Sequence, residues 1–129
     1  WFRENKSKLK LVELSFNDNL NLLKKCIDIL KENNIDLTIL LTVSPVPAFA
    51  TFFDENVVVQ SMGYKSTLRA MIHELLRNHS YENVYYYPSF ELVICNNSSS
   101  YIDDNRHVKF QRVQKVMKHF RRILSNGHN

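Results

Sequence analysis

The stretch Asp36-Leu37-Thr38-Ile39-Leu40-Leu41-Thr42-Val43 decides the fold class. It is nearly continuously apolar, unlike a strand with one face in water, in which apolar and polar residues alternate. Such a run is typical of a strand that is buried on both faces, as in a parallel sheet. Two prolines follow in Ser44-Pro45-Val46-Pro47. Because proline cannot donate a hydrogen bond to a neighbouring strand, we expect the strand to end there.

The segments before and after this run predict alternating helices and strands. Ser15 is predicted to cap a helix that ends near Asn33, with apolar residues at helical spacing. Val57 to Gln60 is predicted as a short strand or an extended segment, and Ser66 as the cap of a following helix. A second apolar strand is expected over residues 83–87, and residues 89–95 fit either a helix or a strand.

The last predicted helix, about residues 109–124, has an apolar face and a basic face. We expect the apolar face to be buried; it comprises Phe110, Val113, Val116, Met117, Phe120 and Ile123. The basic residues include Lys115, Lys118 and Arg122, within a chain of net charge +4. They fit a solvated helix face, or contact with an anionic partner such as RNA or an acidic protein surface.

The order of these elements predicts an α/β fold with parallel strands, and the 129 residues suit one domain or part of one. No run of about 18 apolar residues is present, so neither a transmembrane helix nor a membrane partner is expected. Cys26 and Cys95 lie in apolar contexts and are predicted to be buried free thiols. Without a visible signal peptide or a clear disulfide pair, the sequence favours an intracellular location.

The stretch Ile102-Asp103-Asp104-Asn105-Arg106-His107-Val108 carries the candidate chemistry. Imidazole can accept and return a proton near neutral pH, so His107 is a candidate general base. Asp104, three residues earlier, could hold the other ring nitrogen and stabilise the imidazolium. The alternative is that Asp103 or Asp104 only caps the last helix. Arg106 could form a structural ion pair or contact an anionic substrate.

Other residues give weaker indications of a catalytic or ligand-binding role. Ser44, Ser66 and Ser89 suit turns and caps, whose hydroxyl groups bond to the backbone. The histidines lack metal-ligand spacing and no glycine-rich phosphate loop is present, so no cofactor or metal is expected. Because ligands bind beyond the carboxyl ends of parallel strands, Ser44, Asp104 and His107 are expected to converge on one edge of the sheet.

Four blocks together resemble the GSCFA family, an SGNH-like hydrolase group. The blocks are Ile39 to Pro47 followed by Thr51-Phe52, Val57-Val58-Val59 leading to Tyr64-Lys65-Ser66-Thr67-Leu68-Arg69-Ala70, Tyr86-Tyr87-Pro88-Ser89-Phe90-Glu91, and Asp103-Asp104-Asn105-Arg106-His107-Val108. The resemblance implies a three-layer SGNH-hydrolase-like parallel sheet with flanking helices, and Asp104 and His107 as its catalytic pair. Residues 1–129 then correspond to the C-terminal half of the domain. The Gly-Ser-Cys-Phe-Ala motif that would supply the serine is absent from the chain, so the N-terminal half is expected to be missing.

Two functions follow from the resemblance. In the first, the chain is part of an ester hydrolase or acyltransferase acting on an acylated carbohydrate or similar ester, with the serine outside this chain. In the second, it is a non-catalytic structural subunit of a larger assembly, such as a ribonucleoprotein. Either way, the missing N-terminal half or a partner chain is expected to complete the sheet.

Overall fold

The computed structural model describes residues 8, 12–78, 81–95 and 99–126. These residues form a mixed fold of helices and a small parallel sheet, so the prediction of an α/β fold is confirmed. The elements are helix α2 (Phe16–Asn33), strand β1 (Ile39–Leu41), helix α3 (Val57–Asn78), strand β2 (Val84–Tyr86), helix α4 (Ser89–Ile94) and helix α5 (Phe110–Asn126). No helix in the described ranges is long and apolar enough to cross a membrane.

The two strands pair in parallel, as predicted, with Leu40 opposite Tyr85. Burial of the first strand on both faces was a wrong prediction, because Leu40 is 42% exposed; its partner on β2, Tyr85, is 54% exposed on the same face of the sheet. Residues two apart on a strand point to the same face, so Tyr85 shares its face with Tyr87. Helix α5 covers this face at Tyr87, whose hydroxyl donates to the Val116 carbonyl, but leaves Leu40 and Tyr85 open.

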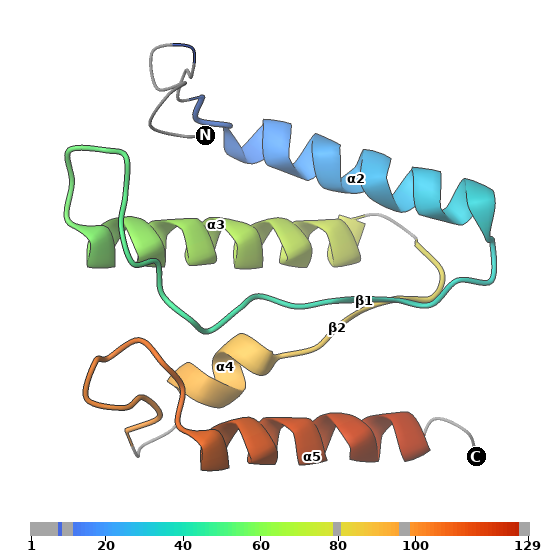
Figure 1. The fold of residues 1–129 in the computed structure, drawn as a ribbon. Helices are drawn as coiled ribbons and strands as arrows, with labels where there is room; N and C mark the ends of the chain where they lie inside the picture. Colours follow the sequence, from blue (N-terminus) through green and yellow to red (C-terminus); the bar gives the residue numbers. More distant parts are fainter. Residues whose placement is uncertain (1–7, 9–11, 79–80, 96–98, 127–129) are drawn as a thin grey trace.

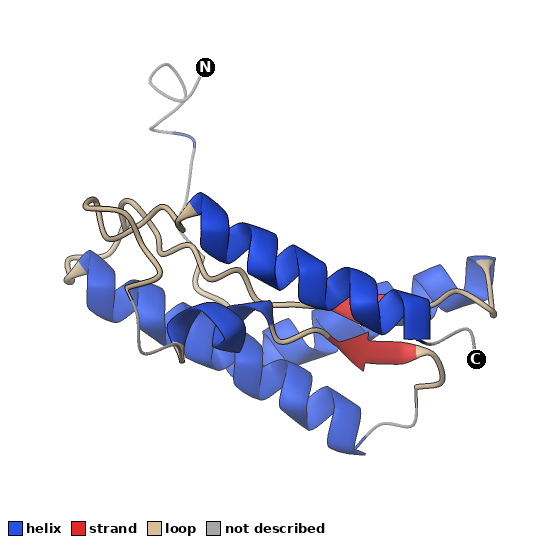
Figure 2. Cartoon of the chain, turned by 90° about the horizontal axis from the view of Figure 1, so that it is seen from below, coloured by secondary structure: helices blue, strands red, loops and turns tan. Residues whose placement is uncertain are grey.

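Helices lie on both sides of the strands. Figure 1 shows α2 and α3 on one side and α4 and α5 on the other, and Figure 2 shows the same arrangement from below. The largest group of buried apolar residues joins α2, α3 and β2, and consists of Leu20, Ile27, Met71, Leu75 and Val84. A second group, Val43, Ile72 and Phe90, fixes the end of the first strand against α3 and α4.

The start of α2 agrees with the prediction from the sequence. The Ser15 hydroxyl accepts a hydrogen bond from the Asp18 amide at 3.1 Å, and the Asp18 carboxylate accepts one from the Ser15 amide at 3.0 Å. This reciprocal capping box satisfies two amides that the first helical turn leaves free. The carboxylate bonds also lower the pKa of Asp18.

The start of α3 differs from the prediction. Val57 to Gln60 is not a strand but the first turn of the helix, and Ser66 lies inside α3 rather than at its start. The Asn56 side chain caps this helix, because its carbonyl oxygen accepts from the Val58 amide at 2.9 Å. Three consecutive valines favour a strand by propensity, but a good cap and the packing of the later turns outweigh that preference.

Helix α5 was placed correctly, but most of its apolar face is not buried. Phe110 is 73% exposed, and Val113, Met117 and Ile123 are also exposed; Val116 and Phe120 are half-buried against the rest of the molecule. The spacing identified the apolar stripe, but the described part of the chain supplies no surface to cover it. Cys26 and Cys95 are free but exposed, so their predicted burial was wrong.

Candidate functional site

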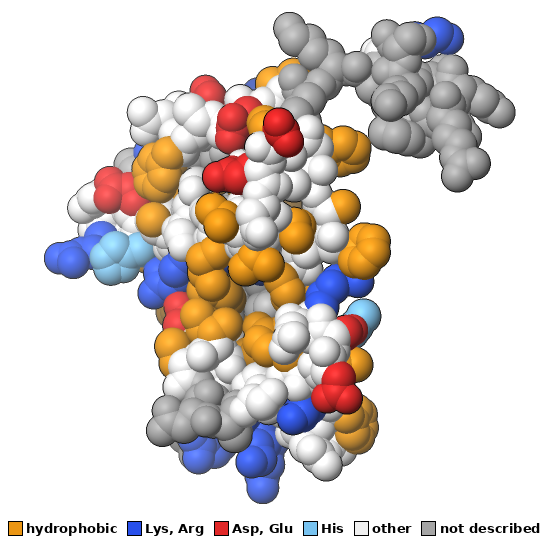
Figure 3. All heavy atoms as spheres, turned by 90° about the vertical axis from the view of Figure 1, so that its left-hand side faces the viewer, with side chains coloured by type: hydrophobic (Ala, Val, Ile, Leu, Met, Phe, Trp, Pro, Cys, Tyr) orange, Lys and Arg blue, Asp and Glu red, His pale blue; other side chains and the backbone are white. Residues whose placement is uncertain are grey.

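The segments that follow the first strand and helix α4 meet at the carboxyl end of the sheet. The Tyr101 hydroxyl donates a hydrogen bond to the Pro45 carbonyl at 2.9 Å, and the Arg106 guanidinium lies over the Phe49 ring at 5.1 Å from its centre. The segment bearing Asp104 and His107 is thereby held against the loop that follows β1, the sheet edge at which parallel folds bind ligands. Figure 3 views this end of the molecule, where hydrophobic side chains gather in the middle and charged ones lie around them.

Residues 101–108 form a tight hairpin. Tyr101 and Val108 make an antiparallel bridge, and the Ile102 amide donates to the His107 carbonyl at 2.9 Å. Asn105 adopts a positive φ of 53°, a backbone conformation that asparagine tolerates better than most residues. Since α5 begins at Phe110, beyond this hairpin, capping of the last helix by Asp103 or Asp104 was a wrong alternative.

Asp104 instead holds the hairpin together. One carboxylate oxygen accepts hydrogen bonds from the Arg106 and His107 amides, both at 2.9 Å. The other oxygen is hydrogen-bonded to His107 Nδ1. The bond with the His107 ring, followed by the two amide bonds, lowers the pKa of Asp104 to about 2. Asp104 is therefore an ionised acceptor at neutral pH.

The geometry fixes which ring nitrogen of His107 is available. Because Nδ1 faces the Asp104 carboxylate, the neutral ring carries its proton on Nδ1, and Nε2 has a free lone pair. The side chain of His107 is 60% exposed, and Nε2 has no hydrogen-bond partner among the described residues. The pair is thus arranged to accept a proton from a hydroxyl group that approaches from solvent.

The sequence matches the GSCFA family model over residues 4–120, most of the chain. The chain belongs to the GSCFA family. The resemblance drawn from the four sequence blocks is therefore confirmed. No curated protein and no solved structure matches the chain.

Two of the GSCFA blocks meet in a cluster that sequence analysis missed. Arg69 Nε lies 2.6 Å from the Glu91 carboxylate, whose other oxygen accepts from the Tyr86 hydroxyl at 2.7 Å. The Arg69 guanidinium also stacks over the Tyr86 ring. Burial opposes ionisation of Glu91, but the bonds from Tyr86 and Arg69 outweigh it and lower its pKa. The sequence offered one indication of this contact, because Arg69 and Glu91 carry opposite charges in two blocks of the family. The cluster joins α3 to the start of α4.

The three serines singled out in this GSCFA chain are bonded in local structure or lie apart from His107. The Ser44 hydroxyl accepts from the Val46 amide at 3.3 Å, as expected for a Ser-Pro turn. The Ser89 hydroxyl donates to the Val43 carbonyl at 3.0 Å, and Ser66 is exposed on α3. Lys65 Nζ donates to the Ser44 carbonyl at 2.7 Å, a second tether of this loop that sequence analysis missed. Ser44 reaches the predicted sheet edge, but no described serine is hydrogen-bonded to His107.

Arg106 lies next to His107 in the hairpin, and no acidic side chain in the described part of the chain pairs with it. It forms no ion pair with a described residue, and its Nε atom is buried without a hydrogen-bond partner. The expected structural ion pair is therefore not found in the described part. Stacking on Phe49 holds the guanidinium at the same edge as His107.

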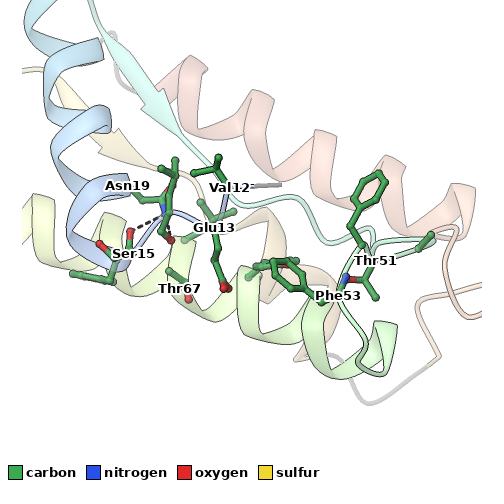
Figure 4. A pocket seen from close by; sticks show the side chains of 13 residues that line it. Val12, Glu13, Ser15, Asn19, Thr51, Phe53 and Thr67 are labelled. Carbon is green, nitrogen blue, oxygen red and sulfur yellow. Dashed lines mark hydrogen bonds between the residues drawn. The ribbon is translucent and has the colours of Figure 1, made fainter. Parts of the chain in front are cut away.

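An open groove of about 800 Å³ lies elsewhere, between the start of α2, the loop of residues 50–53 and α3. Figure 4 shows Val12, Glu13, Ser15 and Asn19 on one wall and Thr51 and Phe53 on the other. Asp104 and His107 do not line it. Within the described ranges, no group of His, Cys, Asp and Glu is placed to hold a metal ion.

Proposed function

We propose that the chain is the base-carrying, C-terminal part of an SGNH-like ester hydrolase or acyltransferase domain. The observation that carries this proposal is the hydrogen-bonded Asp104–His107 pair, exposed at the carboxyl end of the parallel strands. The serine nucleophile comes from a polypeptide segment outside this chain, since the Gly-Ser-Cys-Phe-Ala motif does not occur in the sequence. Membership of the GSCFA family supports the same assignment.

In the proposed reaction, His107 Nε2 removes the proton of the incoming serine as its oxygen attacks the ester carbonyl carbon. Asp104 keeps the Nδ1 proton in place and stabilises the imidazolium that forms. The imidazolium then returns the proton to the departing alcohol, which leaves an acyl-serine. Water, or an acceptor alcohol in a transferase, repeats the sequence and releases the acyl group. The proposed substrate is an acylated carbohydrate or a similar ester.

The sheet supports completion by another segment. It has only two strands in the described part, so each strand has one unpaired edge. Unpaired edges bind further strands readily, and the exposed Leu40 and Tyr85 leave apolar surface for additional packing. Strands from an N-terminal half would extend the pair into the three-layer sheet of an SGNH domain.

The test is hydrolysis of a simple acyl ester by this chain combined with a segment that carries the family's Gly-Ser-Cys-Phe-Ala motif. Replacing His107 with Ala should lower kcat by about a hundredfold or more, because the serine loses its base. Asp104→Asn should cost less, since the imidazole remains. Asp103→Asn is the matched control and should retain activity, because no side-chain bond joins Asp103 to the ring in the described structure. Hydrolysis that continues at an unchanged rate in His107→Ala would contradict this mechanism.

The second candidate function is a non-catalytic subunit of a larger assembly. The observation that favours it is the basic surface of α5, where Lys115, Lys118 and Arg122 are all exposed. On this hypothesis, no assembly that contains the chain hydrolyses esters. Charge reversal at these three positions would then weaken binding of an anionic partner, such as RNA or an acidic protein, and added salt would weaken it further.

A further inference from the structure

Helix α5 presents an uncovered apolar stripe. Phe110, Val113, Met117 and Leu124 recur at the spacing that places residues on one side of a helix, and they are 73%, 42%, 42% and 54% exposed. A shallow, open groove of about 400 Å³ lies between side chains of α5 itself, and is lined by Phe110, Val113, Gln114, Met117, Lys118 and Arg121. A contiguous apolar patch that stays exposed on a folded chain can mark an interaction site.

The charge around the stripe has one sign. Helix α5 contains Arg112, Lys115, Lys118, Arg121 and Arg122, and no aspartate or glutamate. Lys118 and Arg121 line the groove itself. A partner on this stripe therefore gains from carboxylates beside its apolar residues, and a partner with basic flanks is repelled.

The stripe is narrow because both of its sides are occupied. On one side α5 packs against the rest of the molecule. There the ring centres of Tyr87 and Phe120 lie 5.1 Å apart, and the Tyr87 hydroxyl donates a hydrogen bond to the Val116 carbonyl. The other side carries Lys118 and Arg121. A narrow seam of this kind matches the packing of one helix against another, whereas a helix that lies in a membrane surface needs a broad apolar face.

We infer that the groove on α5 binds an acidic amphipathic helix from another polypeptide. Its apolar residues fill the seam along Val113 and Met117, and its glutamates or aspartates pair with Lys118 and Arg121. Two copies of this chain that paired through α5 alone would gain no ion pair across the contact, because the helix has no acidic residue. This inference does not depend on catalysis by Asp104 and His107.

The test uses the full chain and a fluorescent synthetic peptide of about 20 residues, with leucines at i, i+3 and i+7 and glutamates on both flanks. Fluorescence anisotropy gives its Kd at low and physiological salt. Met117→Glu and Lys118→Glu should each weaken binding by about tenfold or more. Both positions are exposed, so both variants should fold, which circular dichroism checks.

Matched controls carry the same changes on α2. Leu22→Glu replaces an equally exposed apolar residue, 48% against 42% for Met117, and Lys25→Glu repeats the charge reversal. The Kd of each control variant for the peptide should lie within about twofold of the Kd of the original chain. Equal loss in the controls would overturn the proposal, as would equally tight binding of a peptide with lysines in place of the glutamates.

The same experiment tests three other possible occupants of the stripe: a lipid membrane, RNA and a second copy of this chain. The proposal fails if phosphatidylserine vesicles or an RNA duplex bind the chain more tightly than the peptide does, with Met117→Glu having no effect on the peptide. It also fails if light scattering shows a dimer of the chain that Met117→Glu disperses.

Discussion

Replacing Tyr101 with Phe removes the hydroxyl that tethers the Asp104–His107 hairpin to the loop after β1. The hydroxyl donates to the Pro45 carbonyl at 2.9 Å, and burial raises the pKa of Tyr101. The substitution keeps the ring and its packing, so the measured effect is that of the hydrogen bond alone. Because this bond joins residues far apart in the sequence, its loss should loosen the site as well as lower stability.

The size of the effect follows from the bond and its surroundings. A typical intramolecular hydrogen bond contributes about 1 kcal/mol net, and an acceptor left without a partner away from water costs about 1–3 kcal/mol. The Pro45 residue is only half-buried, so water can partly replace the lost hydroxyl. We therefore expect Tyr101→Phe to lower the free energy of unfolding by about 1–2 kcal/mol.

Urea denaturation followed by circular dichroism measures this change. With a slope of about 2 kcal/mol per molar urea, the midpoint should fall by roughly 0.5–1 M. Tyr85→Phe is the matched control, since Tyr85 is 54% exposed and its hydroxyl has no partner among the described residues. It should leave the midpoint unchanged.

Hydrogen exchange distinguishes loss of the tether from general destabilisation. In Tyr101→Phe the amide of Ile102, which donates to the His107 carbonyl, should exchange faster than amides of the α3 core do. Equal midpoints for the Tyr101 and Tyr85 variants, or acceleration spread evenly over the chain, would refute the tether.

Two further predictions concern the core and the pH dependence of stability. Leu75 is fully buried, so Leu75→Ala should lower the free energy of unfolding by about 3–4 kcal/mol. Leu68 on the same helix is 41% exposed, so Leu68→Ala should lower it by about 1 kcal/mol or less. Equal losses in the two variants would contradict the observed packing. The pKa of Asp104 is lowered to about 2, so its stabilising effect is present above about pH 4 and is lost as the pH falls through about 2. The stability difference between the original chain and Asp104→Asn should therefore shrink over that range.

Local signals in the sequence predicted the features that depend on neighbouring residues. The Ser15 capping box fixed the start of α2, and the spacing of Asp104 and His107 predicted a pair that the structure shows hydrogen-bonded. Asn56 was an equally local signal for the start of α3, but the valines after it favoured a strand. Two competing local preferences cannot be ranked without knowing what the later turns of the helix contact.

The parallel pairing of the two strands was predicted from their order, but individual contacts between distant residues were not. Helical spacing identified the apolar stripe of α5, but it does not say whether this chain covers that stripe, and Phe110 proves to be exposed. Likewise, the Tyr101–Pro45 and Arg69–Glu91 contacts join segments whose proximity depends on the whole fold. No periodicity along the chain encodes such contacts.

The central claim is that His107 activates a serine from outside this chain, and labelling with a fluorophosphonate tests it most directly. The probe forms a covalent adduct with an activated serine, and mass spectrometry locates the adduct in the complex of this chain with the motif-bearing segment. We predict an adduct on the serine of the Gly-Ser-Cys-Phe-Ala motif, with labelling slowed about a hundredfold or more by His107→Ala. An adduct on Ser44, or motif labelling that is unchanged in His107→Ala, would contradict the account.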